Sequence, residues 1–461
     1  MISNAVFKEL KNITKNNITK KKEDLLCYSY DATGRSFLPD AVVFPSSTNQ
    51  VSEILKLAQK EFFYVIPRGS GSGMTGGALP VMGGVVMVFT RMNHILKIDK
   101  KNIIAIVEPG VITQDLHKAV EKEKLFYPPD PASSSFCTIG GNIGECAGGP
   151  RAIKYGVTRD YVLGLEAVLA SGEIIKTGVK TAKGVAGYDL TRLIVGSEGT
   201  LAIVTKIILK LIPLPEKVKT AAVVFNSMEK AVSTILAIIH AGMVPRCIEY
   251  MDKASINCVK NDLSFISSNS IFQKIEAILI IELDGEVDLV EKNIKKLEKL
   301  CFFNNASDVI IAKNSRETQN LWKGRKALSP ALFKFAPNKI NEDIVVPINR
   351  IPDMVEKIKE IQIKTKLVII SFGHAGDGNI HCNIMYDKKN DKQASLAKIA
   401  VDELFNYTLE IGGTITGEHG VGITKKKYLN LEIGQTEIKI MKSIKQIFDP
   451  RNILNPRKIF I

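Results

Sequence analysis

The chain has 461 residues, of which 45% are hydrophobic and 24% are charged. A chain of this length can bury substantial cores, and length alone suggests about two to four domains. Its formal net charge of +14 comes mostly from scattered Lys residues, without an Arg-rich or aromatic-interleaved block. This pattern argues against nucleic-acid binding, and it suits an anionic substrate, an acidic partner, an anionic membrane face or simply a solvated Lys-rich surface.

The seven Cys residues form no CxxC pair and no paired spacing. This argues against a disulfide framework, a zinc ribbon and an iron-sulfur cluster. The N-terminus has no apolar core of the secretory type, and the apolar runs 84–89 and 277–281 are far too short to span a bilayer. We therefore expect a reduced, cytoplasmic chain that associates at most peripherally with the inner face of the membrane.

The first half of the chain predicts an α+β domain. We expect a helical segment over residues 1–35 and a domain over residues 36–215. Within the domain, residues 41–69 predict strand, polar cap, helix and strand, because the apolar residues from Val51 to Ala58 keep a helical spacing. Short strands and turns follow, up to a Pro-punctuated boundary around residues 213–219.

Residues 216–461 predict a second domain. Strands alternate with a helix around residues 231–240 and with a Lys-rich helix further on, which resembles split βαβ units on an antiparallel sheet. We expect this domain to cover the ligand of the first and the last ~30 residues to return to the first domain. The predicted fold class is therefore α+β throughout.

The first glycine-rich block, residues 67–80, contains a formal GxGxxG at Gly71, Gly73 and Gly76. A Rossmann site requires a helix to open at this motif, but Gly77 and Pro80 forbid one, so the Rossmann interpretation is rejected. What remains is a run of backbone N–H groups that can converge on a pyrophosphate, or a flexible solvent-exposed loop.

The second block, residues 128–149, repeats this design and is followed by segments 155–169 and 194–204. In order and content these blocks resemble the FAD-binding fold of the vanillyl-alcohol-oxidase/p-cresol-methylhydroxylase flavoproteins. The resemblance implies a PCMH-type domain whose first loop holds the pyrophosphate, whose second block lines the flavin, and whose Ile203 and Val204 meet the adenosine. Because His94 and His117 lie outside the loops, we expect the FAD to be non-covalent. The implied FAD residues are Pro67, Arg68, Gly69, Ser70, Gly71, Ser72, Gly73, Met74, Thr75, Gly76, Gly77, Pro129, Asp130, Ser133, Thr138, Gly140, Gly141, Asn142, Gly144, Ala147, Gly148, Gly149, Tyr155, Gly156, Glu198, Gly199, Ile203, Val204 and Asn455.

Three of the six His residues lie in two late motifs, residues 371–383 and 417–422. On a straight strand His374 and His381 would point to opposite faces, but the turn at residues 376–378 could bring both imidazoles together. Two His and Glu418 are a sensible ligand set for a divalent metal, with Zn²⁺ or Mn²⁺ expected. The alternative is that the two His are hydrogen-bonded structural residues.

These motifs resemble the C-terminal domain of flavin-linked 2-hydroxy acid dehydrogenases, a group that includes glycolate oxidase flavoprotein subunits, D-lactate dehydrogenases and D-2-hydroxyglutarate dehydrogenase. The resemblance implies that His374, His381 and Glu418 hold the metal and that His419 is the base. It also implies that Arg325 binds the substrate carboxylate, with Asn383 near the substrate and Lys339 as a less secure addition.

The expected reaction is FAD-dependent oxidation of a small 2-hydroxy acid, of the glycolate or D-lactate type, with D-2-hydroxyglutarate as an alternative substrate. The resemblance also implies an iron-sulfur partner subunit or a quinone-linked acceptor, and leaves a homodimer as one option. Two rival hypotheses remain. A non-catalytic FAD-binding subunit would have no need of the late His and Glu residues, and a metal hydrolase would be colourless rather than yellow.

Overall fold

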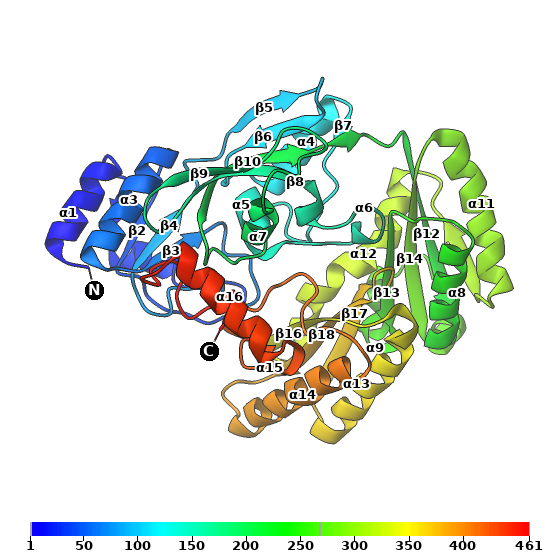
Figure 1. The fold of residues 1–461 in the computed structure, drawn as a ribbon. Coiled ribbons are helices and arrows are strands. Elements are labelled where there is room, and N and C mark those ends of the chain that lie inside the picture. The colour runs from blue at the N-terminus through cyan, green and yellow to red at the C-terminus, as the bar shows by residue number, and fades with distance from the viewer. Residues whose placement is uncertain (1, 267–268, 461) are drawn as a thin grey trace. The chain divides into compact units, whose positions relative to one another are not determined.

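Two units make up the chain in the computed structural model, which describes residues 2–266 and 269–460. Unit 1 comprises Met1–Gly148, Gly156–Leu214 and Glu418–Ile461, and unit 2 comprises Gly149–Tyr155 and Pro215–Gly417. The colours of Figure 1 follow the chain from the blue N-terminal helices of unit 1 to its red C-terminal helix. Each unit is therefore assembled from segments that are far apart in the sequence.

The first sheet of unit 1 has four strands in the order β1-β2-β4-β3. Strands β2 (Ala41–Val43), β4 (Val85–Val88) and β3 (Val65–Arg68) are parallel, whereas β1 (Ile18–Thr19) runs antiparallel to β2. Helix α3 (Thr48–Glu61) connects β2 to β3, and its apolar residues share one core with helix α1 (Asn4–Ile13). This is the strand–helix–strand start that the sequence predicts.

The second sheet of unit 1 has five antiparallel strands in the order β5-β6-β10-β8-β9. Alternating burial along β10 shows that one face of this sheet is packed, as expected of an antiparallel sheet with one covered side. The strands are β5 (Ile95–Asp99), β6 (Ile104–Val107), β8 (Val162–Val168), β9 (Ile174–Gly178) and β10 (Ile203–Lys210).

Smaller elements complete unit 1. A two-stranded ribbon pairs β7 with β11, and short helices connect the strands. Their bounds are α2 (Lys22–Cys27), α4 (Thr113–Lys122), β7 (Leu125–Phe126), α5 (Ile139–Glu145), η1 (Thr158–Tyr161), α7 (Leu190–Ile194), β11 (Ile212–Pro213), α15 (Leu429–Glu432) and α16 (Gln435–Phe448).

The C-terminal segment is bound to the first sheet by backbone hydrogen bonds. The N–H of Val65 donates to the carbonyl of Ile453 at 2.9 Å, and the N–H of Asn455 donates to the carbonyl of Val65 at 2.9 Å. Ile453 and Leu454 are fully buried in the core that contains α3. The end of the chain is therefore part of the core of unit 1.

Unit 2 is built on one seven-stranded sheet in the order β15-β12-β14-β13-β17-β18-β16, in which every neighbouring pair is antiparallel. Strands β12 and β14 are apolar over most of their length and bury six and seven of their nine residues, respectively. The strands are β12 (Lys217–Phe225), β13 (Cys247–Asp252), β14 (Ala277–Gly285), β15 (Asp308–Ile311), β16 (Asn338–Val345), β17 (Val368–His374) and β18 (Asn379–Tyr386).

Helices pack on the sheet of unit 2 (Figure 1). Four helices contact the sheet: α8 (Met228–His240), α11 (Val287–Phe303), α13 (Ile351–Thr365) and α14 (Asp391–Glu410). Helix α8 also contacts α11 and α13, and α13 contacts α14. Buried apolar residues of α9 (Lys253–Cys258) and α12 (Ser315–Ala331) form one hydrophobic core with residues of the sheet. The remaining bounds are α6 (Ala152–Tyr155), η2 (Lys260–Asp262), α10 (Asn269–Lys274), η3 (Leu332–Lys334) and η4 (Ile348–Arg350).

The predicted α+β class, with an antiparallel sheet in the second half, is confirmed. The sequence did not predict helix α5, because its segment IGGNIGE is rich in Gly, which disfavours helix. Thr138 begins the helix by accepting a hydrogen bond from the N–H of Gly141. Across residues 2–266 and 269–460, no helix is both long and apolar enough to cross a lipid bilayer.

Candidate functional site

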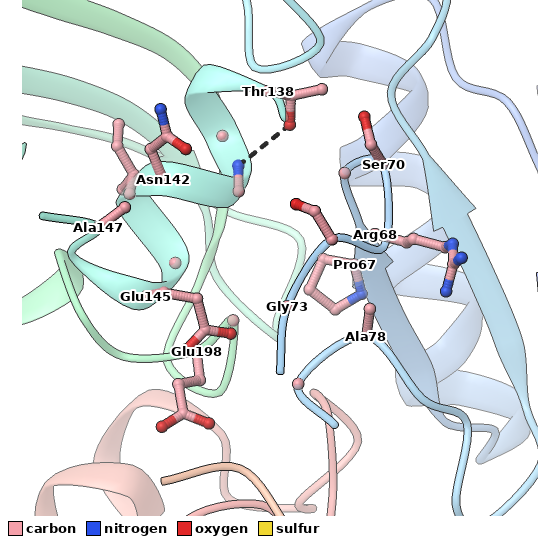
Figure 2. A pocket seen from close by; sticks show the side chains of 18 of the residues that line it. Pro67, Arg68, Ser70, Gly73, Ala78, Thr138, Asn142, Glu145, Ala147 and Glu198 are labelled. Atoms are coloured by element: carbon pink, nitrogen blue, oxygen red, sulfur yellow. Dashed lines mark hydrogen bonds between the residues drawn. The ribbon is translucent and has the colours of Figure 1, made fainter. Parts of the chain in front are cut away.

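A large cavity lies in unit 1 between the two glycine-rich blocks, helix α5 and the chain around Glu198 (Figure 2). Its volume is about 1410 Å³ with the solvent at its mouth included. Glycine and other small residues make up much of its lining, so the main chain is open to close approach by an extended cofactor. The predicted cofactor residues that line it are Pro67, Arg68, Gly69, Ser70, Gly71, Ser72, Gly73, Met74, Gly77, Ser133, Thr138, Gly140, Gly141, Asn142, Gly144, Ala147, Glu198, Gly199, Ile203 and Val204.

The loop after β3 presents backbone donors to this cavity. The N–H groups from Gly69 to Gly73 donate to no other residue in the part of the chain that the structure describes. Successive N–H groups of this kind form a concave site for an anion. The loop can therefore hold a phosphate group without a helix, as its sequence predicts.

Several predicted cofactor residues lie away from the cavity wall. The side chain of Asn455 donates to the carbonyls of Gly77 (2.8 Å) and Glu198 (2.7 Å), and so joins two parts of the wall. The hydroxyl of Thr75 donates to the carbonyl of His419 at 3.0 Å. These residues hold the wall in place. The other predicted residues off the wall are Gly76, Pro129, Asp130, Gly148, Gly149, Tyr155 and Gly156.

Two residues predicted to bind FAD have side chains that bond to other parts of the protein instead of facing the cavity. The Arg68 guanidinium donates to the carbonyl of Tyr30 at 2.8 Å and points away from the cavity in Figure 2, so only the rest of the residue lines it. Tyr155 belongs to unit 2, where its hydroxyl donates to Asp284 at 2.9 Å. Neither contact could be inferred from the local sequence.

The segment from Glu418 to Gly422 brings two polar side chains to the cavity. Glu198 accepts hydrogen bonds from the N–H groups of Val421 and Gly422, both at 2.8 Å. With the Thr75 contact, these bonds fix the loop on both sides, and Glu418 and His419 line the cavity. His419, the candidate base, thus lines the same cavity as the glycine-rich loop.

Buried charges surround this end of the cavity. Burial raises the pKa of Glu198 to about 6, against the opposing effect of its two N–H donors. Burial, and then the charge of Glu198, raise the pKa of Glu145 well above its usual range. Burial lowers the pKa of Lys458 to about 8, although the neighbouring carboxylates oppose this shift. The sequence analysis did not identify Glu145 or Lys458: Glu145 lies within the second glycine-rich block, but no residue spacing marks either side chain as functional.

In unit 2, the hairpin of β17 and β18 brings His374 and His381 together. Their Nε2 atoms lie 3.3 Å apart, and both side chains are buried. The carboxylate of Glu249, which pairs with His374 across β13 and β17, hydrogen-bonds the Nδ1 of that ring. The carboxylate therefore orients the imidazole so that Nε2 faces His381.

Arg325 of α12 contacts the same carboxylate. Its Nη2 lies 2.8 Å from Glu249, and its guanidinium carbon lies 4.6 Å from the ring centroid of Phe372. Burial alone would raise the pKa of Glu249, but the charges of His374 and Arg325 hold this pKa below its usual value. Glu249 is a residue that the sequence analysis missed, because its partners come from two other elements.

The two further predicted substrate residues lie on strands of the same sheet. The buried Asn383 accepts from Asn341 at 2.7 Å and donates to the carbonyl of His381 at 3.0 Å. Lys339 donates to the hydroxyl of Ser329 at 2.8 Å, and burial lowers its pKa. Because the register pairs residues 339, 341 and 343 with 385, 383 and 381, these side chains share one face of the sheet.

Asp343 connects His381 with Gly417 at the end of unit 2. Asp343 faces the Nδ1 of His381 at 3.9 Å and accepts a hydrogen bond from the N–H of Gly417 at 2.9 Å. Glu418 is the next residue in the chain.

Comparison with known proteins decides the family. The C-terminal domain family of FAD linked oxidases matches residues 214–459, and the FAD binding domain family matches residues 39–178. A glycolate oxidase subunit from Bacillus subtilis is 44% identical over 100% of this chain and 97% of its own length. The chain belongs to the FAD-linked oxidases. The resemblance stated from the sequence is confirmed.

Other relatives of this FAD-linked oxidase agree with its fold. A D-lactate dehydrogenase from Anaerostipes hadrus is 35% identical over 91% of this chain and 89% of its own length. The solved structure of p-cresol methylhydroxylase matches with a TM-score of 0.81 at 18% identity, covering 100% of this chain and 98% of its own. At that identity the structural match establishes the fold alone.

The cavity of this FAD-linked oxidase fits FAD. Its open N–H groups at Gly69–Gly73 suit the pyrophosphate. A Cβ built on Gly144 would meet no protein atom within 4 Å, so that the missing side chain leaves room on the cavity wall. The cradle is made of backbone and small residues, as close approach of a large flat ligand requires.

Proposed function

We propose that this FAD-linked oxidase oxidises a small 2-hydroxy acid, of the glycolate or D-lactate type, to the 2-keto acid. The names of its relatives, a glycolate oxidase subunit and a D-lactate dehydrogenase, support this substrate class. The observation that carries the proposal is the position of His419 on the wall of the cavity whose glycine loops fit FAD. A base beside the cofactor is what oxidation of an alcohol needs.

In the proposed reaction, His419 removes a proton and Arg325 binds the carboxylate. When bound, FAD supplies the acceptor for the hydride that leaves C2 of the substrate. A ring nitrogen of His419 takes the hydroxyl proton. Arg325 uses one nitrogen for Glu249, and its Nε has no partner among the described residues, so donors of its fork remain for a carboxylate.

We further propose that His374, His381 and Glu418 hold a divalent metal, Zn²⁺ or Mn²⁺. Two imidazole nitrogens bound at about 2.0–2.1 Å to one tetrahedral metal lie roughly 3.3 Å apart, and the Nε2 atoms of His374 and His381 are 3.3 Å apart. Glu249 on the far nitrogen of His374 is the carboxylate that such metal-binding rings commonly have. A bound metal would lower the cost of deprotonating the hydroxyl.

The substrate proposal is tested by anaerobic mixing of the yellow protein with glycolate, D-lactate, L-lactate, D-malate and D-2-hydroxyglutarate. Glycolate or D-lactate should bleach the flavin fastest. Bleaching by none of the five contradicts the proposed function, whereas preferential bleaching by D-2-hydroxyglutarate reassigns the substrate within the same class. Acid precipitation should release the yellow colour into the supernatant, because the FAD is proposed to be non-covalent.

The metal proposal has its own test. Purified wild type should contain about one equivalent of metal per chain, and Glu418→Gln, His374→Ala and His381→Ala should lower metal content while FAD content stays constant. Added Zn²⁺ or Mn²⁺ should restore part of the activity of Glu418→Gln. If chelators remove no metal and leave activity intact, the three residues are not ligands, although the roles of FAD and His419 stand.

We also propose a separate electron acceptor, an iron-sulfur partner subunit or a quinone-linked protein. The seven Cys residues are all unpaired and spread over the chain without cluster spacing. The isolated chain should therefore reduce an artificial dye quickly and oxygen slowly. Peroxide formation at a rate comparable to dye reduction contradicts the need for a partner.

A further inference from the structure

Glu145 places a carboxyl group on the cavity wall near Glu198 (Figure 2), and His419 lines the same cavity. A Cβ built on Gly77 would clash with its Oε1, and a Cβ built on Gly420 would clash with its Oε2. Any side chain at these two positions would displace the carboxyl group. Two glycines from distant parts of the sequence thus make room for it.

The same carboxyl group has an unmet hydrogen-bonding need. Its Oε2 is buried and has no hydrogen-bond partner among residues 2–266 and 269–460. A buried polar atom without a partner is costly, and native proteins rarely keep one without a reason. A ligand in the cavity is one partner that could satisfy it.

Burial and the surrounding charges favour the protonated form of the Glu145 carboxyl group. Glu198 accepts two backbone N–H groups, whereas no described donor contacts Oε2 of Glu145. Of these two neighbouring acids, Glu198 therefore keeps the negative charge. Burial first, and then the charges of Glu198 and Asp31, favour the protonated form of Glu145 and raise its pKa, against the smaller opposing effect of Lys458. A protonated carboxyl group carries one O–H donor.

We propose that Glu145 is a neutral carboxylic acid that donates a hydrogen bond to the polar edge of the flavin ring and thereby raises the reduction potential of bound FAD. The proposal rests on the proposed function, because the base His419 marks the end of the cavity where the reacting ring lies. Two-electron reduction places negative charge on the polar edge of the ring. A preorganised donor stabilises that charge more than it stabilises the oxidised ring.

Two alternative roles for Glu145 predict different effects of its substitution on the reduction potential of FAD. An ionised Glu145 would repel the charge of the reduced ring and lower its potential, so that removal of the charge would raise the potential. A purely structural Glu145 would shape the wall without touching the ring, so that a substitution would change FAD content or stability but not the potential. The potential therefore separates all three roles.

The experiment compares two variants of similar length in the FAD-loaded protein. Glu145→Gln keeps a neutral donor, and Glu145→Met removes it. At a fixed poise against a reference dye, the ratio of reduced to oxidised flavin should fall roughly tenfold in Glu145→Met, a shift of about 30 mV for a two-electron couple. In Glu145→Gln the ratio should stay within about threefold of wild type.

A higher potential in Glu145→Gln, or an unchanged potential in Glu145→Met, overturns the proposal. If Glu145→Met does not fold, wild type and Glu145→Gln still decide the matter by infrared difference spectra of reduction. Wild type should show a protonated carboxyl band that changes on reduction and is absent in Glu145→Gln, and no such band overturns the proposal. Failure of the proposed function would instead appear as a chain that binds no FAD or is bleached by no hydroxy acid.

Discussion

The two units form their candidate sites from different materials. In unit 1 the cavity is made of backbone and small residues, with Gly69 to Gly73 presenting N–H groups. In unit 2 the site is made of long polar side chains, among which Glu249 contacts both His374 and Arg325. A backbone site tolerates few additions of volume, whereas a side-chain site tolerates few losses of charge.

The largest effect should come from His419, the one proposed catalytic group on the cavity wall of unit 1. His419→Ala should lower kcat by about 10²–10⁴, because a positioned base contributes that much. FAD and metal content should stay constant, since the glycine loops and the proposed ligands remain. His240→Ala, at an exposed helix end, is the matched control. A loss below tenfold in steady-state kinetics would assign the base elsewhere.

The next effect should be the loss of Glu249 in unit 2. Glu249→Ala leaves the mostly covered Arg325 guanidinium, whose side chain is 14% exposed, without its buried carboxylate, and breaking such a pair costs about 3–5 kcal/mol of unfolding free energy. Urea unfolding measures this loss. Glu249→Gln keeps the volume and a hydrogen-bond acceptor, and should lose less. If Glu249→Ala costs under about 1 kcal/mol, solvent reaches the pair and its burial is not energetically important.

Arg325 should affect substrate binding more than stability. Arg325→Lys keeps the charge but loses the planar fork, so KM should rise roughly tenfold or more while FAD content is unchanged. Lys339→Ala is the comparison, because Lys339 already donates to Ser329. A larger KM effect in Lys339→Ala than in Arg325→Lys would move the carboxylate site to Lys339.

Substitutions of two glycines of α5 should separate effects on folding stability from effects on FAD binding in unit 1. A Cβ on Gly140 would lie 2.9 Å from the carbonyl oxygen of Pro109, so Gly140→Ala should destabilise the apoprotein by about 1–3 kcal/mol. A Cβ on Gly144 meets no protein atom within 4 Å, so Gly144→Ala should leave unfolding unchanged or gain up to about 1 kcal/mol.

FAD affinity should respond differently from stability in Gly144→Ala. Gly144→Ala should weaken FAD binding in a titration, because the added methyl group occupies the cavity wall. Equal FAD affinity in Gly144→Ala and wild type would mean that FAD does not reach this part of α5.

The smallest effect should come from Thr138, the N-cap of α5 (Figure 2). Thr138→Ala removes the acceptor of the Gly141 N–H and should cost about 1 kcal/mol in thermal unfolding without FAD. Thr138→Ser keeps the hydroxyl and should cost a few tenths of that. If the two variants are equally unstable, the loss comes from the methyl group of Thr138 rather than from the cap.

Much of this architecture was predictable because its signals are local. The spacing of apolar residues from Val51 to Ala58 predicts α3, and the glycines of residues 67–80 predict a loop rather than a helix. The turn at residues 376–378 predicts the hairpin that brings the side chains of His374 and His381 together. Each of these features depends on residues that are neighbours in the chain.

Contacts between distant segments were not predictable. Nothing near Glu249 in the sequence indicates His374 or Arg325, and the three meet only because β13 lies beside β17 while α12 crosses their face. The same holds for Glu145, whose neighbours Gly77 and Gly420 come from opposite ends of the chain. Helix α5 was missed because its cap and packing outweigh the low helix propensity of Gly.

By itself, the sequence determined the chemistry that each segment can offer. It specified backbone donors in the glycine loops, imidazoles on a hairpin and a further imidazole in the segment after Gly417. The tertiary structure alone decided which charges are buried beside one another, and therefore which acids are neutral and which are paired. The physical reason is that burial and Coulomb interactions depend on distances in space, whereas propensity and turn chemistry act between neighbours along the chain.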